Sequence, residues 1–137
     1  MAIKRSELRY KIMTILYQVN LYKKNEILFE TDEIINEQLE NKNTFVSNIV
    51  KGVISHQEQI DEIANSFLDS WTIDRLGLTD QAIIRMAIYE LLYTNTPSLV
   101  CIDEAIELSK QYSDEKVCKM INGVLDKIYH QKEEYEQ

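Results

Sequence analysis

Hydrophobic residues recur along most of the chain at the three- and four-residue spacing of an amphipathic helix. The most regular stripe lies near the C-terminus and consists of Val117, Met120, Ile121, Val124, Leu125 and Ile128. A second stripe near the N-terminus consists of Leu8, Ile12, Ile15, Leu16 and Val19. This spacing places each set on one face of a helix, so both segments are predicted to pack that face against a core.

The same pattern predicts further helices between these two. The expected helical segments are 4–22, 30–41, 44–69, 79–94, 99–112 and 114–131, with a break near Gly52–Ser55 and a tight connection at 71–77. Segment 79–94 is expected to be central, because its apolar residues cover a wide arc and a wide arc indicates burial on several sides. Thr79 is its expected N-cap, and Ser113 is the expected cap of the last helix.

We therefore predict an all-α fold of about seven helices, arranged as two packed three-helix bundles that share one core. Residues 1–137 form a single domain with an N-terminal half at 1–69 and a C-terminal half at 70–131, followed by a frayed charged tail at 132–137. The 3 glycines and 1 proline leave few turn positions, which disfavours sandwiches and barrels. The glycines are also too far apart for a phosphate-binding loop.

Composition excludes several classes of protein. Charged residues interrupt every apolar stretch before it reaches the ~18 residues that span a bilayer. The N-terminus lacks the uninterrupted apolar segment of a secretory signal, so a cytoplasmic protein is expected. Cys101 and Cys118 form no C-x-x-C motif and are expected to be free thiols.

Catalytic or metal-binding chemistry finds little support. His56 and His130 lie in no recognisable motif, and no Cys/His cluster predicts a metal site. A nucleophile pair of Cys118 with His130 stays open, although a cysteine beside an apolar stripe is typical of a partly buried thiol. The carboxylates of Asp103, Glu104 and Glu107 are expected to form a solvated acidic face. We expect no enzyme activity, no cofactor and no metal.

Charge is distributed unevenly in a protein whose net charge is −8. Residues 1–24 carry a net charge of +5, and residues 25–41 carry −6. One interpretation is that the basic end binds phosphates while the acidic body binds a basic protein. The alternative is an ordinary solvated helix, and charge alone does not decide between them.

The first helix offers a second indication. Tyr10, Met13 and Tyr17 fall away from the Leu8/Ile12/Leu16 stripe and are expected to face outward beside Arg9. Cations next to aromatic rings are typical of single-stranded RNA binding, because bases stack on the rings while the cations contact the backbone. Packing of both tyrosines on a neighbouring helix is the competing interpretation.

Four stretches resemble the NusB family of transcription antitermination factors. They are WTIDRL at 71–76, DQAIIRMAIYELL at 80–92, IDEAIELSK at 102–110 and KMINGVLDK at 119–127. The opening helix, with Arg5, Arg9 and Leu16-Tyr17-Gln18, is also similar to that of the family. The resemblance extends over the whole chain, although 25–65 match mainly by helical pattern.

The resemblance implies an all-α fold and a non-enzymatic role in antitermination. It implies that the protein pairs with the ribosomal protein NusE and that the pair binds the single-stranded boxA element of nascent ribosomal RNA. Other Nus factors and RNA polymerase would be engaged indirectly. Some family members are homodimers that cover the RNA-binding helix, so a homodimer is also possible.

The resemblance also assigns roles to individual residues. It implies RNA-binding positions at Lys4, Arg5, Arg9, Tyr17, Lys119 and Met120, and partner-binding positions at Tyr17 and Asp80. Asn122 and Gly123 are expected to fix helix packing, and Arg85, Glu90 and Glu104 to form internal ion pairs. Ser6 and Glu7 stand where the family usually has further arginines, which implies weaker RNA binding by the isolated protein and dependence on NusE.

These assignments have a testable consequence. Replacing Arg5 and Arg9 by glutamate is expected to remove RNA binding and leave the fold intact.

Two other functions remain open: an RNA-independent adaptor between proteins, and an RNA-modifying enzyme, since some ribosomal RNA methyltransferases carry a NusB-like domain. A chain of 137 residues without a glycine-rich cofactor motif disfavours the enzyme.

Overall fold

The computed structural model of the chain describes residues 4–136, in which seven α-helices, one short 3₁₀-helix and no strand are present. The α-helices are α1 (Arg5–Lys24), α2 (Thr31–Gln38), α3 (Thr44–Ser55), α4 (Gln57–Phe67), α5 (Leu78–Tyr93), α6 (Ser98–Tyr112) and α7 (Glu115–Glu136). The 3₁₀-helix η1 (Ile73–Arg75) lies between α4 and α5. This architecture confirms the predicted all-α fold of about seven helices. None of the helices in this part of the chain is both long and apolar enough to cross a bilayer.

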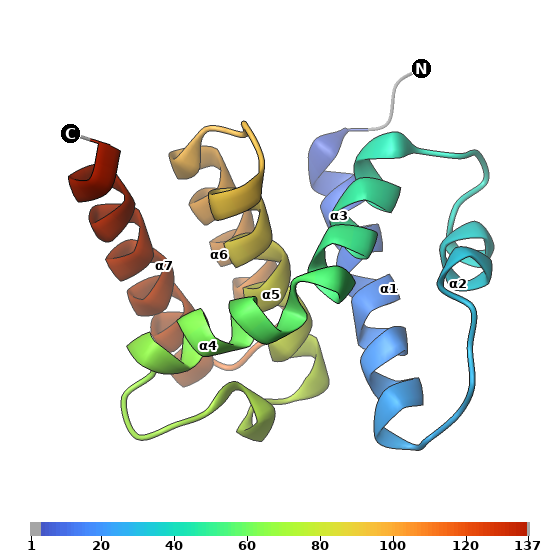
Figure 1. Cartoon of the computed structure of the whole chain (residues 1–137), viewed down its shortest axis with the longest axis horizontal. Helices are drawn as coiled ribbons and strands as arrows, with labels where there is room; N and C mark the ends of the chain where they lie inside the picture. The colour runs from blue at the N-terminus through green and yellow to red at the C-terminus, as the bar shows by residue number, and fades with distance from the viewer. Residues whose placement is uncertain (1–3, 137) are drawn as a thin grey trace.

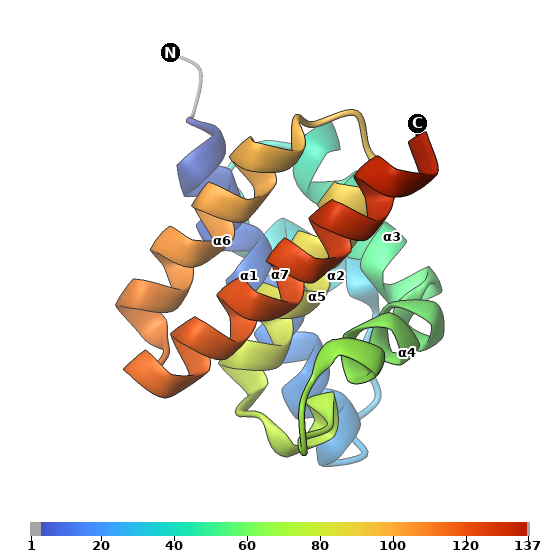
Figure 2. The same ribbon diagram turned by 90° about the vertical axis from the view of Figure 1, so that its left-hand side faces the viewer.

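Helix α5 is the central element (Figure 1). It contacts α1, α3, α4, α6 and α7, and Figure 2 shows α7 lying across it. Every residue of α5 from Gln81 to Leu91 except Tyr89 is buried. The wide apolar arc predicted this position correctly, because a helix surrounded on all sides has no face left for charged residues that lack partners.

The helices form two groups around α5. Helices α1, α2 and α3 contact one another on one side, and α6 and α7 pack together on the other. Helix α4 contacts α3, but it also contacts α5, α7 and η1, so it connects the two groups. A division into halves after residue 69 stays a prediction.

Three helix boundaries differ from those expected. Helix α5 begins at Leu78 after the N-cap Gly77, so Thr79 lies inside the first turn and caps nothing. Asp114 rather than Ser113 caps α7, since its Oδ1 accepts a hydrogen bond of 2.8 Å from the Val117 amide. The α3–α4 break falls at His56, where φ is −111° and ψ is 14°.

The C-terminal helix is longer than predicted, because α7 continues to Glu136 where a frayed tail was expected from residue 132. The Lys132 ammonium donates a 3.0 Å hydrogen bond to the Leu91 carbonyl oxygen and a 3.4 Å bond to Ser98 Oγ. Leu91 is near the end of α5, so its carbonyl oxygen is one of those without an intrahelical partner. A charged residue in this tail thus binds the fold at a helix C-terminus, where a cation is stabilised.

Two glycines behave differently from expectation. Gly52 does not break α3 but allows close packing against α5, since a Cβ at this position would lie 2.1 Å from Cζ of Tyr89. Gly123 was expected to fix helix packing together with Asn122. Both residues are exposed, and a Cβ at Gly123 would meet nothing within 4 Å. Packing therefore does not require glycine at position 123.

Candidate nucleic-acid and partner interface

Arg9 lies in the interior, where it joins α1 to α5. Its side chain is 4% exposed, and its Nε and Nη2 donate hydrogen bonds of 2.7 and 2.8 Å to the two carboxylate oxygens of Glu90. Glu104 of α6 lies 4.0 Å away. Burial lowers the pKa of Arg9, but the hydrogen bond and the charge of Glu90 outweigh that effect and the pKa is raised. Arg9 is therefore fully charged and committed to an internal ion pair.

This placement corrects the assignment of Arg9 to RNA binding. A guanidinium that makes a bidentate contact inside the protein is not available to a phosphate. Replacing Arg9 by glutamate would put a carboxylate beside buried Glu90, so we now expect the Arg5/Arg9 double variant to be destabilised instead of keeping its fold. Met13, expected to face outward, is 4% exposed and belongs to the core.

The fully exposed cations along α1 lie near its two ends, and half-buried Lys11 lies between them. Lys4 and Arg5 are exposed at its first turn, and Lys23 and Lys24 are exposed at its last. A helix of 20 residues is about 30 Å long, so the two groups do not form one patch. Cζ of Arg5 lies 3.8 Å from the centroid of the Phe45 ring of α3, a cation–π contact that positions the guanidinium.

Tyr10 and Tyr17 face outward from α1, as predicted. Each is 39% exposed, and their seven-residue spacing places them on the same side of the helix. The Tyr10 ring also lies 5.6 Å from the Tyr112 ring at the end of α6. Tyr10 is therefore exposed and also packs on a neighbouring helix, and its role in RNA binding stays a prediction.

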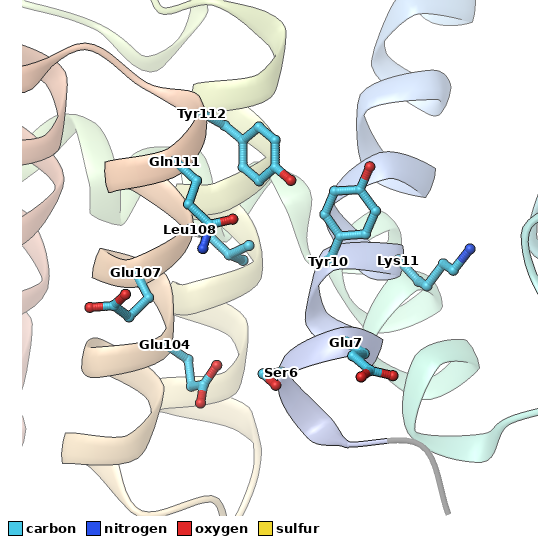
Figure 3. Close-up of a pocket in the computed structure, with 9 residues that line it drawn as sticks. All are labelled: Ser6, Glu7, Tyr10, Lys11, Glu104, Glu107, Leu108, Gln111 and Tyr112. Carbon is cyan, nitrogen blue, oxygen red and sulfur yellow. The ribbon is translucent and has the colours of Figure 1, made fainter.

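A groove of about 430 Å³ lies between α1 and α6, next to the rings of Tyr10 and Tyr112. We call it the α1–α6 groove, and its lining residues are Ser6, Glu7, Tyr10, Lys11, Glu104, Glu107, Leu108, Gln111 and Tyr112. Figure 3 shows the two tyrosines facing each other across it, with carboxylates on both walls. Three glutamates against one lysine make this groove acidic and aromatic, which suits a basic protein surface better than a phosphate backbone.

Lys119 and Met120 lie in the first turns of α7. Lys119 is 78% exposed and forms an exposed ion pair with Glu115 at 3.5 Å. Such a pair contributes little to stability, so the lysine can exchange it for a phosphate. Met120 is half-buried against the core, which leaves part of its side chain accessible.

Asp80 is half-buried in the first turn of α5 and accepts a hydrogen bond from the Ser113 hydroxyl. Ser113 belongs to the loop that connects α6 with α7. The structure therefore brings Asp80 close to the beginning of α7, although 33 residues separate Asp80 from Ser113. Asp80 therefore joins the start of α5 to the α6–α7 loop, and it is also a candidate for partner binding.

The predicted internal ion pairs are confirmed. Besides the pairing of Glu90 and Glu104 with Arg9, the Arg85 guanidinium donates hydrogen bonds of 2.8 and 3.0 Å to the carboxylate of Asp61. Arg85 also donates a 3.2 Å bond to Oδ1 of Asn20. These contacts join α5 to α4 and α1, so the buried arginines are structural.

The two thiols have no catalytic arrangement. Cys118 and His130 both lie on α7, and a separation of 12 residues corresponds to about 18 Å along a helix. Cys118 instead contacts the Ser109 hydroxyl at 3.0 Å. The nucleophile pair is therefore wrong. No group of three or more metal-ligating side chains occurs among residues that the structure describes.

The environments of the cysteines predict a difference in reactivity. Burial, and next the charge of Glu90, raises the pKa of the Cys101 thiol from 9.0 to about 12. Because the thiolate is the reactive form, a thiol reagent at pH 8 should label half-buried Cys118 in the native protein and Cys101 only on unfolding. Ellman's assay with and without urea measures this, and a Cys118→Ser variant identifies the fast site. Two fast thiols would contradict the prediction.

The raised pKa also affects stability at high pH. The folded-state pKa of Cys101 exceeds the unfolded value of 9.0, so its protonated thiol stabilises the fold below pH 9. That contribution should be lost between pH 9 and about 12, as the unfolded chain ionises first.

Comparisons with known proteins agree with the all-α fold. The NusB family profile matches residues 6–130. The transcription antitermination protein NusB of Campylobacter jejuni subsp. doylei is 40% identical over 127 residues, which is 90% of this chain and 94% of that protein. The structure of NusB from T. maritima is 29% identical, with a TM-score of 0.84 and full coverage of both chains.

A second similar structure contains a complex. It is that of the antitermination factors NusB and NusE with double-stranded RNA, and its matching chain has 27% identity and a TM-score of 0.77 over 93% of this chain and 96% of that one. These relatives are transcription antitermination proteins. The family profile spans most of the chain and the sequence identity reaches 40%. The chain therefore belongs to the NusB family of transcription antitermination proteins.

Proposed function

We propose that this protein pairs with NusE and that the pair binds the boxA element of nascent ribosomal RNA, in support of transcription antitermination. The single observation that carries the proposal is that exposed Lys4 and Arg5 at the start of α1 lie beside a groove lined by carboxylates and aromatic rings. A similar protein of the family has been crystallised with NusE and RNA. Other Nus factors and RNA polymerase would be engaged through this complex, in the cytoplasm.

The contacts of the proposed RNA surface lie at two separate places, Lys4 and Arg5 at the start of α1 and Lys119 with Met120 near the start of α7, and a bound RNA strand would extend from one to the other. Without Arg9 this surface offers three cations to phosphates. On single-stranded RNA, each phosphate contact contributes about −0.7 to the slope of log affinity against log salt concentration. Three contacts should therefore give a slope of only about −2. Weak electrostatic binding of this kind supports dependence on a partner that supplies further RNA contacts.

The proposed partner surface consists of Tyr17, Asp80 and the α1–α6 groove. Tyr10 and Tyr17 supply exposed aromatic area on one side of α1, and the groove supplies an excess of carboxylates. Aromatic residues are enriched in the buried centres of protein interfaces, and opposite charge steers a basic partner onto them. A homodimer through the same tyrosines would compete with NusE for this surface, and size-exclusion chromatography of the protein alone would detect it.

A charge reversal at Arg5 tests the RNA surface. The Arg5→Glu variant should bind boxA RNA in the presence of NusE about tenfold more weakly or worse, because it loses a charge-assisted contact and adds repulsion. Lys23→Glu, at the other end of α1, is the matched control and should bind nearly as well as wild type. Fluorescence anisotropy with labelled boxA and scrambled RNA measures both.

The outcomes separate the candidate functions. Unchanged affinity of a folded Arg5→Glu variant would overturn the proposed RNA surface. A stable complex with NusE that binds neither RNA would favour the RNA-independent adaptor instead. Tight binding to boxA only in the presence of NusE would support the proposal as it stands.

A further inference from the structure

A second groove lies on the other side of the first turn of α1, between α3 and the end of α5. We call it the α3–α5 groove; its volume is about 470 Å³ and it is lined by Arg5, Phe45, Asn48, Ile49, Tyr89, Tyr93, Thr94, Asn95 and Thr96. Figure 1 shows the α5–α6 loop at the same end of the molecule as the first turns of α1. The groove is therefore adjacent to the proposed RNA surface but distinct from the α1–α6 groove.

Aromatic rings form much of the wall of this groove. The rings of Tyr89 and Tyr93 are stacked with centroids 5.2 Å apart and an interplanar angle of 17°. The His56 ring lies 4.6 Å from that of Tyr93 and supports it from α3's C-terminal end. Tyr93 nevertheless remains 40% exposed. Its neighbours thus hold an accessible ring in place, which lowers the entropy lost when a flat ligand stacks on it.

The polar groups of the groove are cationic or neutral. Arg5, held over the Phe45 ring, is the charged member of the lining set, whereas the α1–α6 groove has three glutamates. Asn48 and Asn95 are exposed, and within residues 4–136 their side chains form no hydrogen bond. In a protein with a net charge of −8, such a groove favours an anionic ligand with hydrogen-bonding edges.

We infer that the α3–α5 groove binds one unpaired base of single-stranded RNA together with its adjoining phosphate. Tyr93 offers a ring face to the base, the two asparagine amides can donate to and accept from its edge, and Arg5 faces the phosphate. The site extends the RNA path beyond the start of α1. The inference rests on the proposed function, because Arg5 belongs to both surfaces.

The test compares RNAs of different length bound to the complex with NusE. One RNA contains boxA alone, and two others add three unpaired nucleotides at the 5′ or the 3′ side, with 2-aminopurine in the added segment. One extension should increase the affinity of the wild-type complex, and stacking should quench the 2-aminopurine fluorescence on binding. The Tyr93→Ala variant should bind that extended RNA between about five- and about 150-fold more weakly than wild type.

Variants keep this test decisive. Tyr93→Phe retains the ring and should behave as wild type. Asn95→Ala changes an exposed residue outside any helix, so it should weaken binding of the extended RNA without affecting the fold. Leu28→Ala, 98% exposed after the far end of α1, is the control and should change nothing. The inference is overturned if boxA alone binds but neither extension adds affinity or quenching. Absence of any RNA binding would instead refute the proposed function, and the inference with it.

Discussion

Replacing Glu90 by alanine is expected to lower the free energy of unfolding by about 3 to 5 kcal/mol. Glu90 is 1% exposed and accepts both hydrogen bonds of the Arg9 guanidinium, so the variant leaves a buried positive charge without its main partner. Glu104 cannot replace it, because it lies 4.0 Å from Arg9 and is itself 31% exposed. Urea denaturation followed by circular dichroism measures the change.

Two further variants test the cause. Glu107→Ala removes an exposed carboxylate that pairs with Lys110 at 3.6 Å and should cost less than about 1 kcal/mol. A double variant, Arg9→Met with Glu90→Leu, should recover much of the lost stability, because it removes both buried charges. A loss below about 1 kcal/mol in Glu90→Ala would show that this ion pair does not hold α1 to α5.

Replacing Leu91 by alanine is expected to cost about 2 to 5 kcal/mol. The Leu91 side chain is fully buried near the end of α5, and truncating it loses apolar contact and leaves a cavity. The backbone carbonyl that accepts from Lys132 is retained, so the change isolates side-chain packing. Leu99→Ala, at a side chain that is 60% exposed, is the matched control and should change stability by less than about 0.5 kcal/mol. Similar losses in both variants would contradict the central position of α5.

The sequence predicted helices and their buried faces well where apolar residues recur at helical spacing. The stripe of α7 and the wide arc of α5 each follow from local periodicity, which does not depend on the rest of the fold. Ends of helices were predicted less well: α5 begins at Leu78 after the N-cap Gly77, and Lys132 holds the end of α7 through contacts with distant residues. These contacts have no local signature.

The interface residues were harder to predict, because a charged side chain can either form an ion pair inside the protein or stay exposed for a ligand. Arg9 was assigned to RNA, although it shares a helical face with Ile12, Met13 and Leu16, and this spacing was an available sign of burial. Its partner Glu90 is 81 residues away, and only the packing of α1 on α5 identifies it. Phe45, Tyr93 and Tyr112 were not singled out, since grooves between helices arise from tertiary packing.

The position of α5 also constrains how this family can change over evolutionary time. Because α5 packs on helices from both groups, a segment that contains only one group would expose the apolar surface that the other now covers. Neither group can then be exchanged between genes as a separate module. Variation should instead accumulate on surfaces away from α5, such as the loop that contains fully solvated Leu28 and the outer face of α7 around Gly123. Recombination would act on the whole chain as one unit.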